Sequence, residues 1–143
     1  MIKEFEKQDE SAVLSIWLEA SLIAHDFIPA YYWKEKSEDL LSRYLPSSKT
    51  FVYVNDKTRE VEGFMSLVEN YIAALFVKPN LQGKGIGSQF ISYAKGKHNT
   101  LQLKVYARNI KAVNFYEKHG FSTIDCNVEE STGETEILMT FTK

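Results

Sequence analysis

The chain has 143 residues, 44% of them hydrophobic and 25% charged, which is the size and composition of one globular domain. Its net charge of −2 excludes the strongly basic balance typical of nucleic-acid-binding proteins, and no apolar run approaches the ~20 residues of a membrane helix. A single cysteine, Cys126, and three dispersed histidines leave no pattern for an internal disulfide or a metal cluster.

The first half of the chain predicts one strand, two helices and three strands, in that order. Residues 2–5 form the first strand, and Asp9 is a candidate N-cap for the helix that follows. The buried face of this helix is predicted from apolar residues at helical spacing, namely Val13, Ile16, Trp17, Ala20 and Ala24. A second helix is predicted over residues 31–44, and the strands cover residues 51–54, 61–68 and 71–77.

The second half predicts a helix, a strand, a helix and two strands. The helix begins near Gly85, and the later elements cover residues 101–106, 109–117, 122–128 and 135–142, with Gly120 just past the last helix. Residues 72–77 are apolar throughout, which predicts a central strand covered on both faces.

These elements predict one α+β domain over residues 1–143. Strands that follow one another closely are expected to pair antiparallel, whereas the strand–helix–strand crossover over residues 71–106 is expected to be parallel. The result is a mixed α/β arrangement, a mostly antiparallel sheet of six or seven strands with about four helices packed on it.

The segment after strand 71–77 is rich in glycine and leads into a helix. Gly83, Gly85 and Gly87 let the main chain approach a ligand closely, and the N–H groups of a helix start suit a phosphate. A Walker loop is excluded because Gly85 stands where Ser or Thr is required, and the dinucleotide fingerprint fails at Ser88. A glycine-rich turn without a ligand stays open on these residues alone.

Two sequence blocks together resemble the GNAT superfamily of N-acetyltransferases. The first is Gln82-x-x-Gly85-x-Gly87 after an apolar strand, and the second is Asn109-x-x-Ala112-x-x-Phe115-Tyr116-x-x-x-Gly120-Phe121. Either block alone is a weak signal, but the two in this order and separation are a strong one. The resemblance covers essentially the whole chain and is greatest to small bacterial single-domain members.

The resemblance implies that acetyl-CoA is the co-substrate and that strands 71–77 and 101–106 splay apart to receive its pantetheine arm. The residues implied in holding it are Leu75, Phe76 and Val77 on the strand, Gln82, Gly83, Lys84, Gly85, Ile86, Gly87 and Ser88 in the loop and helix start, and Asn109. Asn109 would also be a good helix N-cap without any ligand.

The resemblance also implies direct attack of an amine on the thioester, with Tyr116 as the general acid. Glu69, just before the central strand, is a candidate base acting through a water, and His25 is a second candidate. The alternatives are an exposed turn carboxylate for Glu69, a structural histidine for His25, and helix packing for Tyr116.

The resemblance implies that the acceptor wall lies at the segment His25-Asp26-Phe27-Ile28 together with Tyr31, Tyr32 and Trp33. Aromatic faces and carboxylates such as Asp26 and Glu69 would attract a cationic amine. The alternative is that these aromatic residues fill the core. We expect a primary amine as acceptor, with a protein or peptide lysine slightly favoured over a small molecule. We also expect a cytoplasmic monomer or homodimer without metal, nucleic-acid or membrane partner. There are two alternative hypotheses for the function: a non-catalytic acyl-CoA-binding regulatory module, and a different nucleotide-binding enzyme.

Overall fold

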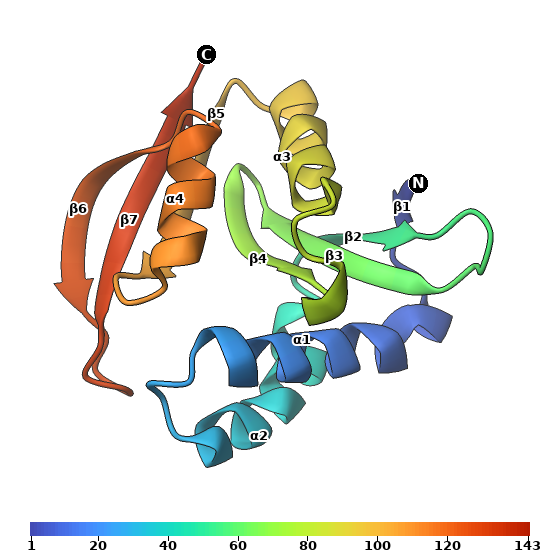
Figure 1. Cartoon of the computed structure of the whole chain (residues 1–143), viewed down its shortest axis with the longest axis horizontal. Coiled ribbons are helices and arrows are strands. Elements are labelled where there is room, and N and C mark those ends of the chain that lie inside the picture. Colours follow the sequence, from blue (N-terminus) through green and yellow to red (C-terminus); the bar gives the residue numbers. More distant parts are fainter.

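Seven strands form one sheet in the computed structural model, which describes all residues from 1 to 143 (Figure 1). They are β1 (Ile2–Glu4), β2 (Lys49–Val54), β3 (Val61–Val68), β4 (Tyr71–Val77), β5 (Thr100–Tyr106), β6 (Ser122–Val128) and β7 (Thr135–Thr142). Their order is β1-β2-β3-β4-β5-β7-β6, and only β4 and β5 pair in parallel. The predicted mixed, mostly antiparallel sheet is confirmed.

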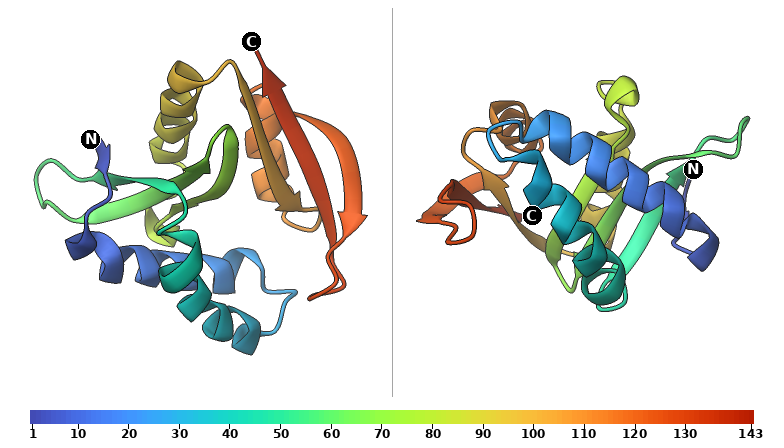
Figure 2. Two further views of the ribbon diagram at one scale, coloured as in Figure 1. Left: turned by 180° about the vertical axis from the view of Figure 1, so that it is seen from behind. Right: turned by 90° about the horizontal axis from the view of Figure 1, so that it is seen from below.

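Four α-helices cover the sheet, two on each face (Figures 1 and 2). One face carries α1 (Glu10–Ala24) and α2 (Ala30–Asp39), and the other carries α3 (Ile86–Lys97) and α4 (Ile110–Lys118). A π-helical turn over Leu40–Tyr44 continues α2, so the second predicted helix changes its hydrogen bonding in its last part. Short 3-10 turns lie at Lys7–Asp9 and Pro79–Leu81.

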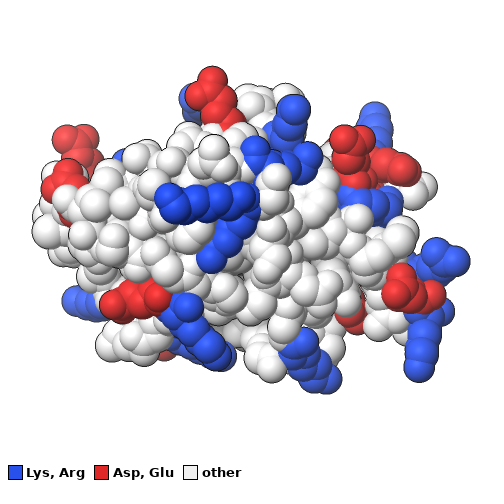
Figure 3. Space-filling model, turned by 90° about the horizontal axis from the view of Figure 1, so that it is seen from above, with Lys and Arg blue, Asp and Glu red and all other residues white.

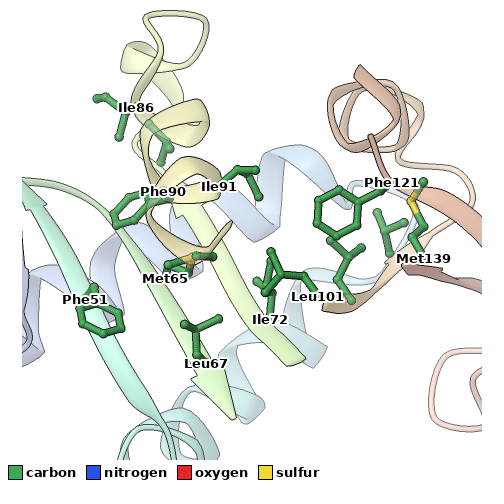
Figure 4. Packing of buried hydrophobic residues seen from close by; sticks show 14 residues of the cluster. Phe51, Met65, Leu67, Ile72, Ile86, Phe90, Ile91, Leu101, Phe121 and Met139 are labelled. Carbon is green, nitrogen blue, oxygen red and sulfur yellow. The ribbon is translucent and has the colours of Figure 1, made fainter. Parts of the chain in front are cut away.

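An apolar core lies on each face of the sheet. The core under α3 and α4 contains Phe90 and Ile91 from α3 together with Leu101 and Leu103 from β5 (Figure 4). The core under α1 and α2 includes Tyr106. Side chains alternate across a strand, so β5 supplies residues to both cores.

Strand β4 is central, as predicted, but it is not covered on both faces. Ala73 is exposed, and residues 74–76 are only half-buried. The reason is that β5 pairs with β4 only at Tyr71 and Ile72, so the rest of β4 has no neighbouring strand on that side.

Two of the three predicted helix-end residues are confirmed. Asn109 Oδ1 accepts the main-chain N–H of Ala112 at 3.3 Å, and Gly120 has a φ of +90°. Asp9 is different because a 3-10 turn precedes α1. Its carboxylate makes no cap bond to α1 and instead accepts the main-chain N–H of Glu6 at 2.9 Å.

Charges of both signs share the surface. The face drawn in Figure 3 carries basic and acidic side chains close to one another. None of the helices combines the length and the apolar character that crossing a bilayer requires.

Candidate active site

The site begins where β4 and β5 part. Only Tyr71 with Gln102 and Ile72 with Leu103 are paired. The two strands run in the same direction, so the gap between them widens toward their carboxyl ends. Residues 73–77 therefore present a strand edge without a partner on that side, and such an edge can accept an added extended chain.

A cavity of about 530 Å³ occupies this gap and crosses the sheet. On the side of α4 it is lined by Leu75, Leu103 and Tyr116, and on the side of α1 and α2 by Trp33 and Tyr106. A ligand entering from one face can therefore meet a ligand entering from the other.

The glycine-rich loop closes the carboxyl end of β4. Gly83 and Gly85 have φ values of +81° and +89°, and a Cβ at either would meet no atom within 4 Å. From Gly83 to Ser88, no main-chain N–H donates to a main-chain carbonyl, and the first such bond of the helix comes from Gln89. The result is a row of free N–H groups at the positive end of α3.

Helix α4 packs against this loop through residues spaced four apart. Lys111 Nζ donates to Gln82 Oε1 at 3.4 Å, and Ser88 Oγ lies 3.0 Å from His119 Nε2. Between them, a Cβ on Gly87 would come within 3.1 Å of the Phe115 ring. Helix packing thus favours glycine at position 87, because an added Cβ would force the Phe115 ring to shift. Lys111 was not predicted as a site residue, because it occupies an unspecified position of the second sequence block.

Tyr116 lines the cavity from α4. Its side chain is half-buried between the rings of Phe115 and Phe121, with ring centroids at 5.3 Å and 5.7 Å. Desolvation by burial raises the pKa of Tyr116 above its ordinary value of 10.0. The phenol therefore keeps its proton at neutral pH.

Asn109 and His25 meet across the cavity. Because Asn109 Oδ1 faces Ala112, its Nδ2 faces His25 Nε2, at 3.3 Å, and donates to it. His25 is then the tautomer with its proton on Nδ1, which has no partner. Burial lowers the pKa of His25 to about 4, against a smaller opposing effect of Glu129. The imidazole is neutral at pH 7 and a weak base.

Several predicted residues lie outside the cavity. Glu69 is exposed in the β3–β4 turn, at the end of the gap where the strands still pair. Asp26 and Tyr31 are exposed, and Phe27 is half-buried beside His25, at a ring separation of 6.0 Å. Of the predicted acceptor wall, His25, Tyr32 and Trp33 line the cavity.

The predicted acceptor-wall residues Tyr32 and Trp33 line the cavity from α2. The structure also brings in two carboxylates that were not predicted from the sequence. Glu129 and Glu136 line the cavity from the β6–β7 hairpin. No local motif marks these two carboxylates, because they reach the site through strand register.

Known proteins resemble this chain over most of its length. A family described as "Acetyltransferase (GNAT) domain" matches residues 19–141. The chain is 35% identical over 133 residues to the peptidyl-lysine N-acetyltransferase YiaC of Escherichia coli K12, covering 92% of this chain and 90% of that protein. It is 31% identical over 136 residues to the peptidyl-lysine N-acetyltransferase YjaB of the same strain, covering 95% and 86%.

Solved structures show the same fold. Apo YjaB from Escherichia coli superposes with a TM-score of 0.86 at 27% identity, covering 99% of this chain and 96% of that one. The PaiA N-acetyltransferase of Thermoplasma acidophilum, solved in complex with coenzyme A, gives 0.79 at 17% identity, covering 100% and 98%. At that identity the second likeness concerns the fold alone.

Proposed function

The chain belongs to the acetyltransferase (GNAT) family, and we propose that this member acetylates lysine side chains in proteins or peptides. It is an N-acetyltransferase that takes its acetyl group from acetyl-CoA. The choice of lysine is supported by two relatives named as peptidyl-lysine N-acetyltransferases, which match 92% and 95% of this chain.

The observation that carries the proposal is that a loop with free main-chain N–H groups follows a strand edge that has no partner in the gap. The free N–H groups of residues 83–88 suit the diphosphate of acetyl-CoA. The open edge of β4 at Leu75, Phe76 and Val77 suits the amides of the pantetheine arm. Lys84 in the loop and Lys111 on α4 would add positive charge beside the diphosphate, where Gln82 carries none.

Acetyl-CoA, when bound, supplies an acetyl thioester that the amine attacks directly. Tyr116 would then donate its phenolic proton to the departing sulfur. A main-chain N–H near Phe76 or Val77 is proposed to donate to the oxygen that gains negative charge. Asn109 would reach the arm only by turning its amide away from His25, because both ends of that amide are engaged.

The two base candidates are not favoured by the geometry. Glu69 lies outside the cavity, and the lowered pKa of His25 makes it a poor proton acceptor at neutral pH. Asp26, Phe27 and Tyr31 would contact only those parts of a peptide that extend beyond the cavity.

An amine panel tests the acceptor. The protein is incubated with acetyl-CoA and, separately, a blocked peptide with one internal lysine, a lysine-free peptide with a free N-terminus, spermidine, and free lysine. Mass spectrometry is expected to find acetylation of the internal lysine. Modification of only spermidine or the N-terminus would overturn the acceptor assignment. Acetyl-CoA binding without turnover of any amine would favour a non-catalytic acyl-CoA-binding module.

The proposal includes a cytoplasmic location, where acetyl-CoA is available, and cell fractionation would test it. A monomer and a homodimer both fit the proposal, and analytical ultracentrifugation would distinguish them.

A further inference from the structure

Two carboxylates from the β6–β7 hairpin enter the cavity on the face covered by α1 and α2. Glu136 on β7 stands opposite Tyr106 on β5. Directly opposed residues of an antiparallel pair point to the same face, and Tyr106 belongs to the core under α1 and α2. Glu129 lies beside them, because the Tyr106 hydroxyl donates to its Oε1 at 2.7 Å.

The two carboxylates differ in how firmly the protein holds them. Glu129 Oε1 accepts a second hydrogen bond, from Thr132 Oγ1 at 2.7 Å, so its position is fixed. Glu136 forms no ion pair, and its carboxylate is half-buried. Glu129 is therefore placed to hold a positive charge, and Glu136 is free to accept a proton.

A second observation points to a ligand in the same cavity. The Trp33 indole N–H and His25 Nδ1 have no partner, although the two side chains are only 7% and 8% exposed. Both residues line the cavity. A buried donor without an acceptor is costly, and the main-chain carbonyls of a bound peptide would supply acceptors.

The walls around the carboxylates suit a lysine side chain. Tyr32, Trp33 and Tyr71 provide aromatic surface along which four methylenes can pack, with the ammonium beyond them. The glycine-rich loop lies at the carboxyl end of β4 and leads into α3, on the face opposite α1 and α2. The α1–α2 face is therefore left for the acceptor.

We propose that Glu129 and Glu136 receive the acceptor lysine on the α1–α2 face, with Glu129 holding its ammonium group and Glu136 taking its proton. This inference rests on the proposed function, because it assigns roles within the same site.

The proton balance of the reaction fits two residues. Glu136 accepts the first proton, which leaves a neutral amine to form the N–C bond as the C–S bond breaks. Tyr116 gives its proton to the sulfur and is reprotonated by the second proton of the amine nitrogen. Glu136 then releases its proton to solvent, so one proton is set free per acetyl group transferred.

The groups that face Glu136 set its pKa. Burial and the neighbouring Glu129 raise the pKa of Glu136 above its ordinary value of 4.5, while Lys104 on β5 opposes them. Tyr71 on β4 lies close enough for Glu136 to raise the pKa of its phenol, after the larger effect of burial. Further charged or titratable residues around the cavity are Lys36, His25, Tyr32, Tyr44, Tyr106 and Tyr116.

The first test uses Glu136→Gln, which keeps the size of the side chain and removes the base. We expect kcat/KM for the lysine peptide to fall roughly 100-fold or more, with KM for acetyl-CoA unchanged. In the wild type, kcat/KM should fall as pH drops through the raised pKa of Glu136. In Glu136→Gln this pH dependence should be absent. Instead, kcat/KM should keep rising as the pH approaches the lysine pKa of ~10.4. The matched control is Glu130→Gln, an exposed neighbour outside the cavity.

The second test measures binding without catalysis. Calorimetry compares a lysine peptide with the same peptide carrying norleucine, in the presence of CoA. The wild type and Glu130→Gln should bind the lysine peptide about 10-fold more tightly, as expected for a charge-assisted contact. Glu129→Gln, which can still accept from Tyr106 and Thr132, should lose this preference. CoA affinity should be equal in all variants, which verifies that they are folded.

The outcomes separate this inference from the proposed function. If the wild type acetylates no lysine peptide, the proposed function fails. If the wild type acetylates lysine while Glu129→Gln and Glu136→Gln both behave like Glu130→Gln, only the carboxylate roles are overturned.

Discussion

A phenol can serve as an acid only while it holds its proton, and burial ensures this for Tyr116. The direction of its pKa shift means that its deprotonation cannot limit the rate below pH 10.0. The neutral His25 differs, because burial lowers its pKa to about 4 and so makes it a poor proton acceptor at neutral pH. Burial thus prepares Tyr116 for its proposed role and weakens His25 for its own.

The variant Tyr116→Phe tests the acid. Loss of the hydroxyl leaves the departing sulfur without its proton donor, so kcat should fall roughly 100-fold, with KM for acetyl-CoA nearly unchanged. Steady-state kinetics measures this, with Tyr93→Phe as the control outside the cavity. An unchanged kcat in single-turnover measurements would remove Tyr116 from the mechanism.

The variant Lys111→Ala tests the charge beside the loop. Lys111 contacts Gln82, and we expect its loss to raise KM for acetyl-CoA roughly 5-fold with little change in kcat. Added salt should shrink the difference, because the side chain is exposed. Adding Gln82→Arg should restore the affinity, whereas Lys34→Ala on α2 should have no effect. Equal KM values for Lys111→Ala and wild type would refute the role.

At the scale of the elements, α4 connects both parts of the site. It carries Tyr116 at the cavity, Asn109 at its start, and three contacts with the glycine-rich loop. One of these contacts joins His119 to Ser88. Burial, Lys95 and Lys118 all lower the pKa of His119, so its ring is neutral in this contact. A displacement of the glycine-rich loop would therefore shift α4 and, with it, Tyr116.

His25 joins α1 to α4 through its hydrogen bond with Asn109, and its burial should make stability depend on pH. The pKa of His25 is about 4 in the folded protein and 6.5 as its ordinary value, so the unfolded chain binds more protons between these values. The free energy of unfolding is therefore expected to be highest above pH 6.5 and to fall by roughly 3 kcal/mol as pH drops toward 4.

Urea unfolding at a series of pH values measures this dependence. His25→Gln keeps an acceptor for Asn109 but does not titrate, so its stability should change less between pH 6.5 and 5. His98→Gln, at the end of α3, should retain the wild-type slope. Identical slopes for wild type and His25→Gln would contradict the prediction.

At the scale of the whole molecule, the fold and the cofactor side could be predicted from the sequence. The order of elements followed from apolar periodicity, and the glycine-rich loop and Tyr116 stand at fixed spacings within single elements. The acceptor side could not be predicted, because Glu129 and Glu136 reach the cavity through strand pairing. Glu69 lies just before β4 in the sequence, at the end where β4 and β5 still pair. It therefore does not reach the gap, although it is close to the strand in the sequence.

Hydrogen exchange tests how a ligand affects the whole sheet. Acetyl-CoA should slow exchange of the amides in residues 73–77 and 83–88, while those of β1 and β2, on the far edge, should change little. Ligand at 100 times its dissociation constant should also stabilise the fold by ~2.7 kcal/mol. Protection confined to β1 and β2 would place the ligand elsewhere.

The brief pairing of β4 with β5 has a wider consequence. Two residue pairs are all that hold the four-strand half of the sheet to the three-strand half through main-chain bonding. A pantetheine arm bound in the gap would bridge these two halves of the sheet. Acetyl-CoA would then raise the free energy of unfolding by joining the two halves, so the ligand-free protein should be the form that a protease cleaves more readily.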